Sequence, residues 1–163
     1  MTSLVTGRLD FGNSVLYDLP AVQLRRLQSV QNAAARLVFS LRRSDSISDA
    51  LICLHWLRVP ERIRFKLAVL TYWALRGEAH QYLPTLRCVA DIPGRRGLRS
   101  ANTTQLLIPR IRLATVGSRS FSVAAPTIWN SLPHDVTSAP STAIFRSRLK
   151  TFLLCCSFPG VVV

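Results

Sequence analysis

The stretch from Val59 to Arg76 constrains the fold of this chain most, because it is apolar on most sides of a helix. Pro60 stands near its start, where a fixed φ and a missing N–H suit the first helical turn, and Gly77 follows as a natural stop. The apolar residues in between are Ile63, Phe65, Leu67, Val69, Leu70, Tyr72, Trp73 and Leu75. A helix of this kind is normally buried at the centre of a domain. The sequence therefore predicts a helical protein built around this segment.

Further helices are expected on both sides of this segment. Their apolar residues recur at helical spacing over about 4–16, 21–41, 46–54 and 141–154. The predicted fold is a mainly α, small helical domain of about five to six helices, with one short β hairpin near 105–114 as an option. We divide the chain into an N-terminal helical half (1–87), a basic loop or linker (88–104), a C-terminal half (105–154) and a divergent tail (155–163).

The expected helix over 21–41 carries two contrasting faces. One face is predicted to be a core stripe and consists of Leu27, Val30, Ala34, Leu37 and Leu41. At about 100° per residue the opposite face holds Arg25, Asn32, Arg36 and Arg43. Residues 21–43 contain no acidic side chain, whereas an ordinary solvated face mixes lysine with glutamate. This favours phosphate contact over simple solvation, and both interpretations stay open.

Charge is the second strong signal in the sequence. The 163 residues include 21 basic and eight acidic side chains, for a formal net charge of +13, and the basic residues are nearly all arginine. Guanidinium groups bind phosphate bidentately and stack on bases, so the excess predicts affinity for polyanions. The alternative is compositional bias without function. The candidate nucleic-acid contacts are Arg25, Arg36, Arg43, Arg95, Arg96, Arg99, Arg110 and Arg112.

Two segments outside the helices supply several of these arginines. Residues 93–100 hold two glycines and three arginines without apolar periodicity, which indicates a loop that either contacts phosphates or serves as a hinge. Arg110 and Arg112 alternate, so both guanidinium groups lie on one face if that segment is extended.

Other kinds of site find little support. No two of the eight acidic residues are adjacent, so the paired carboxylates typical of two-metal phosphoryl transfer are missing and no catalytic residue is predicted. Cys53-Leu-His55 leaves one residue where zinc ligands are usually separated by two to four, so neither a metal nor another cofactor is expected. The longest apolar run, 67–75, is far shorter than the roughly 20 residues of a membrane-spanning helix. We therefore expect no membrane association.

The stretch Phe121-Ser-Val-Ala-Ala-Pro-Thr-Ile-Trp-Asn-Ser-Leu-Pro133 is more particular than folding alone requires. Pro126 is expected to open a short helix, since its missing N–H costs nothing there, and Pro133 to stop it. Trp129 and Leu132 would then share one face.

This stretch resembles the far C-terminal region of polyproteins from LINE-type (non-LTR) retrotransposons of the Jockey-like kind. Four other segments are similar to that family in the same order, so that the resemblance covers roughly residues 4–154. These segments are Leu9–Tyr17, in which Phe11 and Gly12 replace the usual Tyr and Cys, Leu27–Val38, Leu54–Lys66 and Ala139–Lys150. Residues 155–163 depart from the family pattern.

The resemblance implies a non-catalytic segment that follows the core of a reverse transcriptase, an RNA-directed DNA polymerase. It would assist in binding template RNA or target DNA and could contact the upstream polymerase domain. It also implies an intracellular location, in the nucleus or the cytoplasm. The alternative is a structural docking fragment or a decayed open reading frame with no independent activity.

Overall fold

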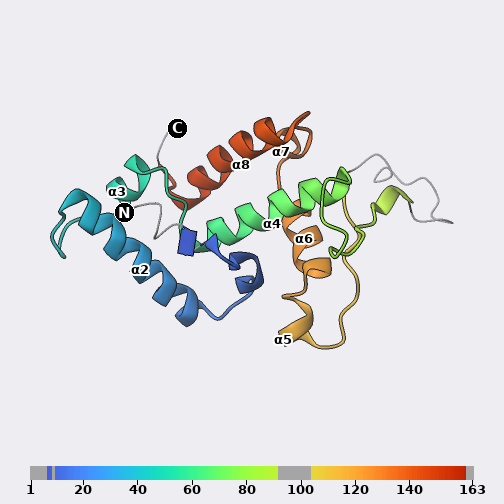
Figure 1. Ribbon diagram of the computed structural model, residues 1–163, viewed down its shortest axis with the longest axis horizontal. Coiled ribbons are helices and arrows are strands. Elements are labelled where there is room, and N and C mark those ends of the chain that lie inside the picture. Colours follow the sequence, from blue (N-terminus) through green and yellow to red (C-terminus); the bar gives the residue numbers. More distant parts are fainter. Residues whose placement is uncertain (1–6, 9, 92–103, 161–163) are drawn as a thin grey trace. The chain divides into compact units, whose positions relative to one another are not determined.

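The computed structural model describes residues 7–8, 10–91 and 104–160 of the chain, and these residues are mainly helical. The elements in chain order are the 3-10 helix η1 (Asn13–Leu16), α2 (Ala21–Phe39), α3 (Ser48–Cys53), α4 (Val59–Leu75), the 3-10 helix η2 (Val89–Asp91), α5 (Ala114–Gly117), α6 (Phe121–Asn130), α7 (His134–Thr137) and α8 (Thr142–Ser157) (Figure 1). The predicted mainly α fold is confirmed. No helix among these elements is long and apolar enough to cross a membrane.

The optional β hairpin near 105–114 is not formed by the described residues. Leu106 instead makes an isolated antiparallel bridge with Cys88. The bridge is held by the backbone N–H of Leu107, which donates to the carbonyl of Arg87 at 2.9 Å, and by that of Val89, which donates to Gln105 at the same distance. The extended segment near 106 therefore pairs with residues that precede it by about 18 positions in the chain, and not with residues 111–113.

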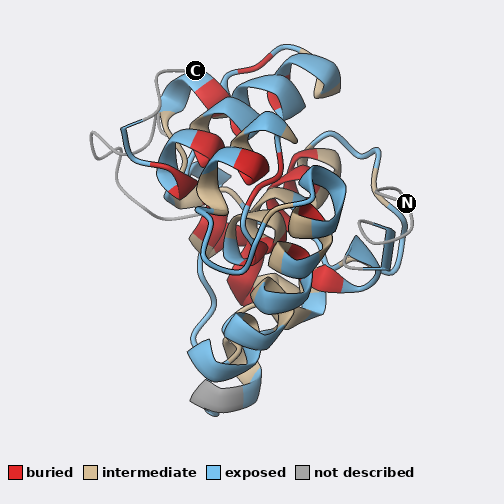
Figure 2. Cartoon of the chain, turned by 90° about the vertical axis from the view of Figure 1, so that its left-hand side faces the viewer, coloured by how far each residue is buried: buried red, intermediate tan, exposed pale blue. Residues whose placement is uncertain are grey.

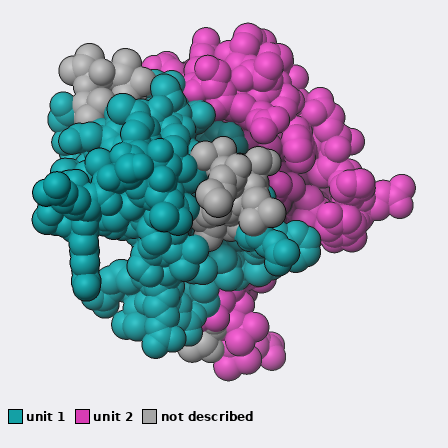
Figure 3. Space-filling model, turned by 60° about the vertical axis from the view of Figure 1, so that its left-hand side comes forward, with its two compact units in different colours: residues 1–65, 149–163 teal, residues 66–148 magenta. Residues whose placement is uncertain are grey.

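The chain divides into two compact units (Figure 3). Unit 1 consists of residues 1–65 and 149–163, and unit 2 consists of residues 66–148. The boundaries fall inside α4 and α8, so the units do not coincide with the expected halves 1–87 and 105–154. A sequence boundary placed at a glycine-rich and basic segment cannot reveal that α4 and α8 are each divided between the two units.

The core of unit 1 comes from α2, from α3 and the segment that follows it, from the start of α4 and from the end of α8. Its buried apolar side chains are Ala35, Ala50, Leu51, Trp56, Leu57, Val59, Ile63, Leu149, Leu153, Leu154 and Phe158. The guanidinium carbon of Arg58 lies 4.9 Å from the centroid of the Phe158 ring. The residues expected to form a divergent tail thus begin inside α8, and Phe158 among them is part of the core.

Helix α2 buries a different face from the one predicted. Val30 and Leu37, two members of the expected core stripe, are 55% and 73% exposed, whereas Gln31 and Ala35 are both fully buried. The buried residues form narrow bands on the helices, with exposed residues over much of the rest (Figure 2). At about 100° per residue, the observed inward direction differs from the predicted one by about 100°. The prediction of the core stripe was wrong.

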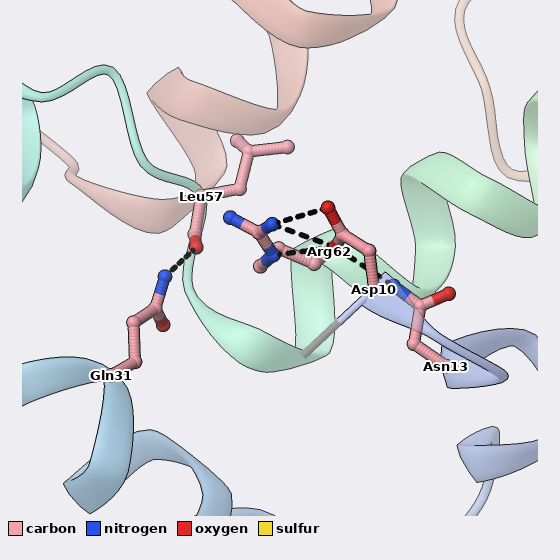
Figure 4. Close-up of polar contacts among 5 residues, drawn as sticks. All are labelled: Asp10, Asn13, Gln31, Leu57 and Arg62. Atoms are coloured by element: carbon pink, nitrogen blue, oxygen red, sulfur yellow. Dashed lines mark hydrogen bonds and ion pairs between the residues drawn. The ribbon is translucent and has the colours of Figure 1, made fainter. Parts of the chain in front are cut away.

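Side-chain amides explain how α2 is oriented. Gln31 Nε2 donates to the backbone carbonyl of Leu57 at 2.8 Å (Figure 4), and the backbone N–H of Val59 donates to Gln28 Oε1 at 2.9 Å. These bonds satisfy backbone groups at the entry to α4, which would otherwise be buried without partners. Because hydrogen bonds are directional, they fix the rotation of α2 more strictly than apolar contacts could.

A second polar cluster ties η1 to α4 within unit 1. Arg62 binds both carboxylate oxygens of Asp10, with its Nη2 atom 2.6 Å from Asp10 Oδ1, and Asn13 Nδ2 donates to the same oxygen (Figure 4). Asn13 is 4% exposed, and its Oδ1 atom has no hydrogen-bond partner. Gly12 precedes it with a φ of 66°, a left-handed conformation that glycine adopts without strain.

Three stacked aromatic rings form the centre of unit 2. The ring centroids of Tyr72 and Phe145 lie 4.3 Å apart, and those of Trp129 and Phe145 lie 5.9 Å apart. Tyr72 also donates its hydroxyl hydrogen to the carbonyl of Ala139 at 2.9 Å, which satisfies its polar end inside the core. These rings join α4, α6 and α8.

Helix α6 begins at Phe121, five residues before the position expected from Pro126. Pro126 lies inside the helix and is fully buried, so the expectation that it opens the helix was wrong. Ser120 is extended and its carbonyl accepts from the N–H groups of Val123 and Ala124, which starts the helix earlier. The pattern around proline gave no sign of this earlier start.

The end of α6 holds the extended segment near Leu106. The Asn130 side chain accepts from the N–H of Leu106 and donates to its carbonyl, both at 2.9 Å. Trp129 Nε1 donates to the carbonyl of Thr104 at 3.0 Å. Asn130 thus makes the two backbone hydrogen bonds to Leu106 that a neighbouring β-strand would make. This gives the conspicuous Trp-Asn pair in the sequence a structural role.

Candidate nucleic-acid interface

Helix α2 places two of the predicted arginines on one side. Arg25 lies one turn after the start of the helix, is exposed, and donates through Nε to the carbonyl of Ala21 at 3.3 Å. Arg36 lies in its last turn and is half-buried, and its Nε atom is buried without a hydrogen-bond partner. Eleven residues at about 1.5 Å each separate the two positions by about 16 Å along the axis. Arg25 and Arg36 therefore lie on one side of α2, with Arg36 partly enclosed.

Arg43 does not belong to this side of α2, because the helix ends at Phe39 and not near Leu41. Ser40 takes a left-handed conformation with φ of 52°, and its N–H and that of Leu41 both donate to the carbonyl of Arg36. Arg43 is exposed in the turn that follows, where Asp45 Oδ2 accepts from the N–H of Arg42 at 2.8 Å. The expected alignment with Arg25 was wrong for this residue.

Arg110 and Arg112 belong to unit 2 and are both exposed. They flank Ile111, whose side chain packs against Gly117 in α5. A Cβ atom built on Gly117 would lie 2.9 Å from the Cβ of Ile111, so this contact needs glycine. The packing anchors the segment between Leu106 and α6, and the two arginines project from an anchored loop.

Arg95, Arg96 and Arg99 lie outside the described residues. The five described candidates are thus shared between unit 1, which holds Arg25, Arg36 and Arg43, and unit 2, which holds Arg110 and Arg112.

Several other arginines are used inside the fold. Arg62 pairs with Asp10, and Arg58 lies over Phe158. Arg76 donates to the carbonyl of Ala139 and lies over the Tyr72 ring, and Arg148 donates to the carbonyl of Asp135. Sequence reasoning chose none of these four as contacts. In contrast, no carboxylate of a described residue pairs with Arg25, Arg43, Arg110 or Arg112.

Sequence reasoning missed two exposed arginines beside the chosen ones. Arg26 lies next to Arg25 on α2, and Arg42 lies next to Arg43 in the turn after the helix. Both fall in the same acid-free stretch, which was the available signal, but the assumed helical face excluded them. An interface on unit 1 would include these two guanidinium groups.

The described residues hold no cluster of three histidine, cysteine or acidic side chains that could bind a metal ion. Burial raises the pKa of the Cys88 thiol, and the nearby Asp91 carboxylate raises it further, so this thiol stays protonated at neutral pH. What the arrangement offers chemically is a set of unpaired guanidinium groups, which suits phosphate oxygens.

Comparison of the chain with protein-family models, with curated proteins and with solved structures finds no match.

Proposed function

We propose that this chain is a non-catalytic C-terminal segment of a retrotransposon RNA-directed DNA polymerase and that it binds template RNA or target DNA through phosphate contacts. The observation that carries the proposal is a set of exposed arginines, unpaired with any described carboxylate, in two acid-free stretches of the chain. The resemblance of five sequence segments to the Jockey-like family supplies the biological setting.

The proposed binding is electrostatic and independent of base sequence. Each guanidinium group neutralises a phosphate and releases condensed counterions, so the affinity falls steeply as salt concentration rises. The logarithm of the binding constant should decrease by about 0.9 per phosphate contact for each tenfold rise in salt on duplex DNA. Arginine side chains that stay unpaired in the free protein favour such binding, because no internal ion pair has to be broken first.

The test is binding of the purified chain to labelled single- and double-stranded RNA and DNA across a salt series. The double variant Arg110→Glu/Arg112→Glu should weaken binding and reduce the salt slope by about two phosphate contacts. The variant Arg146→Glu/Lys150→Glu on α8 makes the same change in net charge at exposed positions outside the candidate set and serves as the control.

Equal losses in both double variants would contradict a localised interface and leave only a general charge effect. Binding that does not change with salt would refute the phosphate mechanism altogether. Circular dichroism of each variant shows whether the helices are retained, so that a loss of binding is not confused with unfolding.

The second candidate function is a docking segment without nucleic-acid affinity. The observation that favours it is the exposed apolar side of α2, where Val30 and Leu37 are accessible to a partner. A folded chain that fails to bind any of the four nucleic acids at low salt would support this candidate over the first.

A further inference from the structure

Helix α2 exposes an apolar stripe along most of its length. The stripe consists of Val22, Val30, Ala33 and Leu37, which lie within about 80° of one another around the helix. Val22 and Val30 are each 55% exposed and Leu37 is 73% exposed. Single exposed apolar residues are common on proteins, but a row of them on one helical face is typical of a surface that packs against a partner.

The stripe is held outward by bonds on the other side of the helix. Gln31, fully buried, is bonded to the carbonyl of Leu57, and Gln28 accepts from the N–H of Val59. Turning α2 by the roughly 160° needed to bury the stripe would break both bonds and leave two backbone groups at the entry to α4 unpaired. Unit 1 therefore presents the stripe on a fixed support.

The charges beside the stripe define the chemistry of the partner. Residues 19–44 contain no acidic side chain, and Arg26 lies within the angular range of the stripe itself. Arg25, its neighbour, is also exposed, and no described carboxylate pairs with either guanidinium group. An apolar strip with arginines among its residues is complementary to apolar side chains bordered by carboxylates.

We propose that the apolar stripe of α2 docks onto an acidic polypeptide, with apolar side chains of the partner on Val22, Val30 and Leu37 and its carboxylates on Arg25 and Arg26. In this arrangement an amphipathic helix lies in a groove of its partner, and its contact residues are spaced three, four and seven positions apart. A phosphate backbone offers no apolar surface for the valines and leucine. A second copy would bring two acid-free helices together. The apolar part of this contact does not depend on the proposed nucleic-acid binding, because Val22, Val30 and Leu37 are side chains that phosphates do not need, whereas Arg25 and Arg26 could serve either partner.

The experiment uses the full chain and two fluorescein-labelled synthetic helical peptides of about three heptads. Both carry leucine at the core positions, and one has glutamate and the other lysine at the flanking positions. The chain should bind the glutamate peptide, with an affinity that decreases as salt rises, and should not bind the lysine peptide. The variant Val30→Ser/Leu37→Ser should weaken this binding by about tenfold or more while nucleic-acid binding is retained.

Two further variants make the outcome specific. The control Phe11→Ser/Val15→Ser removes two other exposed apolar side chains of unit 1 and should leave peptide binding unchanged. Arg26→Glu keeps every residue of the stripe but reverses its charge, so it should lose the glutamate peptide and gain affinity for the lysine peptide. This exchange tests the proposal even if the serine variant is poorly folded.

Other occupants of the stripe would each overturn the proposal by a distinct result. Sedimentation of the chain alone would show a dimer that Val30→Ser/Leu37→Ser converts to a monomer if a second copy covers the stripe. Binding to phosphatidylserine-containing vesicles that the same variant abolishes would identify a lipid surface. Equal binding of both peptides, or no binding of the glutamate peptide by the folded chain, would also refute it.

Discussion

Asn130 illustrates how much of this fold depends on single polar side chains. Its amide makes the pair of hydrogen bonds to Leu106 that a neighbouring β-strand would otherwise make. Leu106 is fully buried, so its N–H and carbonyl cannot turn to water instead. Asparagine is required here because only a primary amide offers a donor and an acceptor in this geometry.

Replacing Asn130 by alanine should lower the free energy of unfolding by about 2 kcal/mol, because it leaves two backbone groups of Leu106 without partners. Urea denaturation followed by circular dichroism measures the change. Ser131→Ala is a suitable control, since its hydroxyl bonds only to the preceding turn and the residue is exposed. A loss no larger than in this control would show that Leu106 is held by other contacts.

Cys88 should be the least reactive of the four thiols. The chain has four free cysteines, of which Cys53, Cys155 and Cys156 are exposed, whereas Cys88 is half-buried. Burial and the Asp91 carboxylate raise the pKa of the Cys88 thiol, so little of the reactive thiolate form exists near pH 8. Alkylation with iodoacetamide followed by mass spectrometry should modify Cys88 last at pH 8, and its rate should still rise above pH 9. Early modification of Cys88 would contradict this.

The raised pKa of the Cys88 thiol also makes the stability of the fold depend on pH. A thiol whose pKa is raised by folding favours the folded state while it is protonated, and this advantage is lost as the pH rises from the unfolded value toward the folded one. Stability should therefore decrease in the alkaline range, above about pH 8.5, and Cys88→Ser should reduce that dependence.

At the scale of elements, α2 is oriented by amides and not by its largest apolar residues. Gln31 lies in the core of unit 1 while Leu37 is exposed to solvent. Hydrophobic spacing identified the helix but not its inward side, because the pattern assigns glutamine to the surface. The competing principle is satisfaction of the buried backbone groups at Leu57 and Val59, which no periodicity can reveal.

Because of this orientation, replacing a polar residue of α2 should destabilise the fold more than replacing a leucine. Gln31→Ala should reduce the free energy of unfolding by about 2–3 kcal/mol, because it leaves the Leu57 carbonyl unpaired and opens a gap. Leu37→Ser should change it by no more than about 0.5 kcal/mol, as expected for a surface position. Chemical denaturation of the two variants side by side decides the matter. If Leu37→Ser were the more destabilising change, the stripe of α2 would have to be buried.

The sequence was sufficient for the major helices and insufficient for what connects them. The apolar segment from 59 to 76 and the glycine after it predicted α4 well, since Gly77 has a φ of 71° at its end. The predicted start of a helix at Pro126 was wrong because the buried position of this residue inside α6 depends on tertiary packing. Among the candidate contacts, Arg25 and Arg110 are exposed, as a contact to phosphate requires. The partial burial of Arg36 depends on how α2 is turned, which the sequence did not reveal.

At the scale of the whole molecule, charge is the dominant property. A formal net charge of +13 on 163 residues produces repulsion that opposes the compact state. Among the described residues the one ion pair between side chains is that of Arg62 with Asp10, so most guanidinium groups in this part of the chain are not paired with a described carboxylate. Salt should therefore act on the stability of this protein as well as on its binding.

Raising the ionic strength from about 0.01 M to about 0.1 M shortens the Debye length from about 30 Å to about 10 Å and screens this repulsion. The melting temperature should rise by several degrees over this range when measured by circular dichroism. The variant Arg110→Glu/Arg112→Glu, with a lower net charge, should show a smaller rise. A melting temperature that falls with added salt would mean that attractive ion pairs outweigh the repulsion.

The two units differ in whether they are built from one continuous segment of the chain or from two. Unit 2 is one continuous stretch, 66–148, whereas unit 1 joins residues 1–65 to residues 149–163. During synthesis, unit 2 can therefore complete its fold while unit 1 still lacks Phe158, the ring that Arg58 covers. Residues 1–65 would lack this part of their core until residues 149–158 have been synthesised, and they would be exposed to proteases and chaperones during that interval.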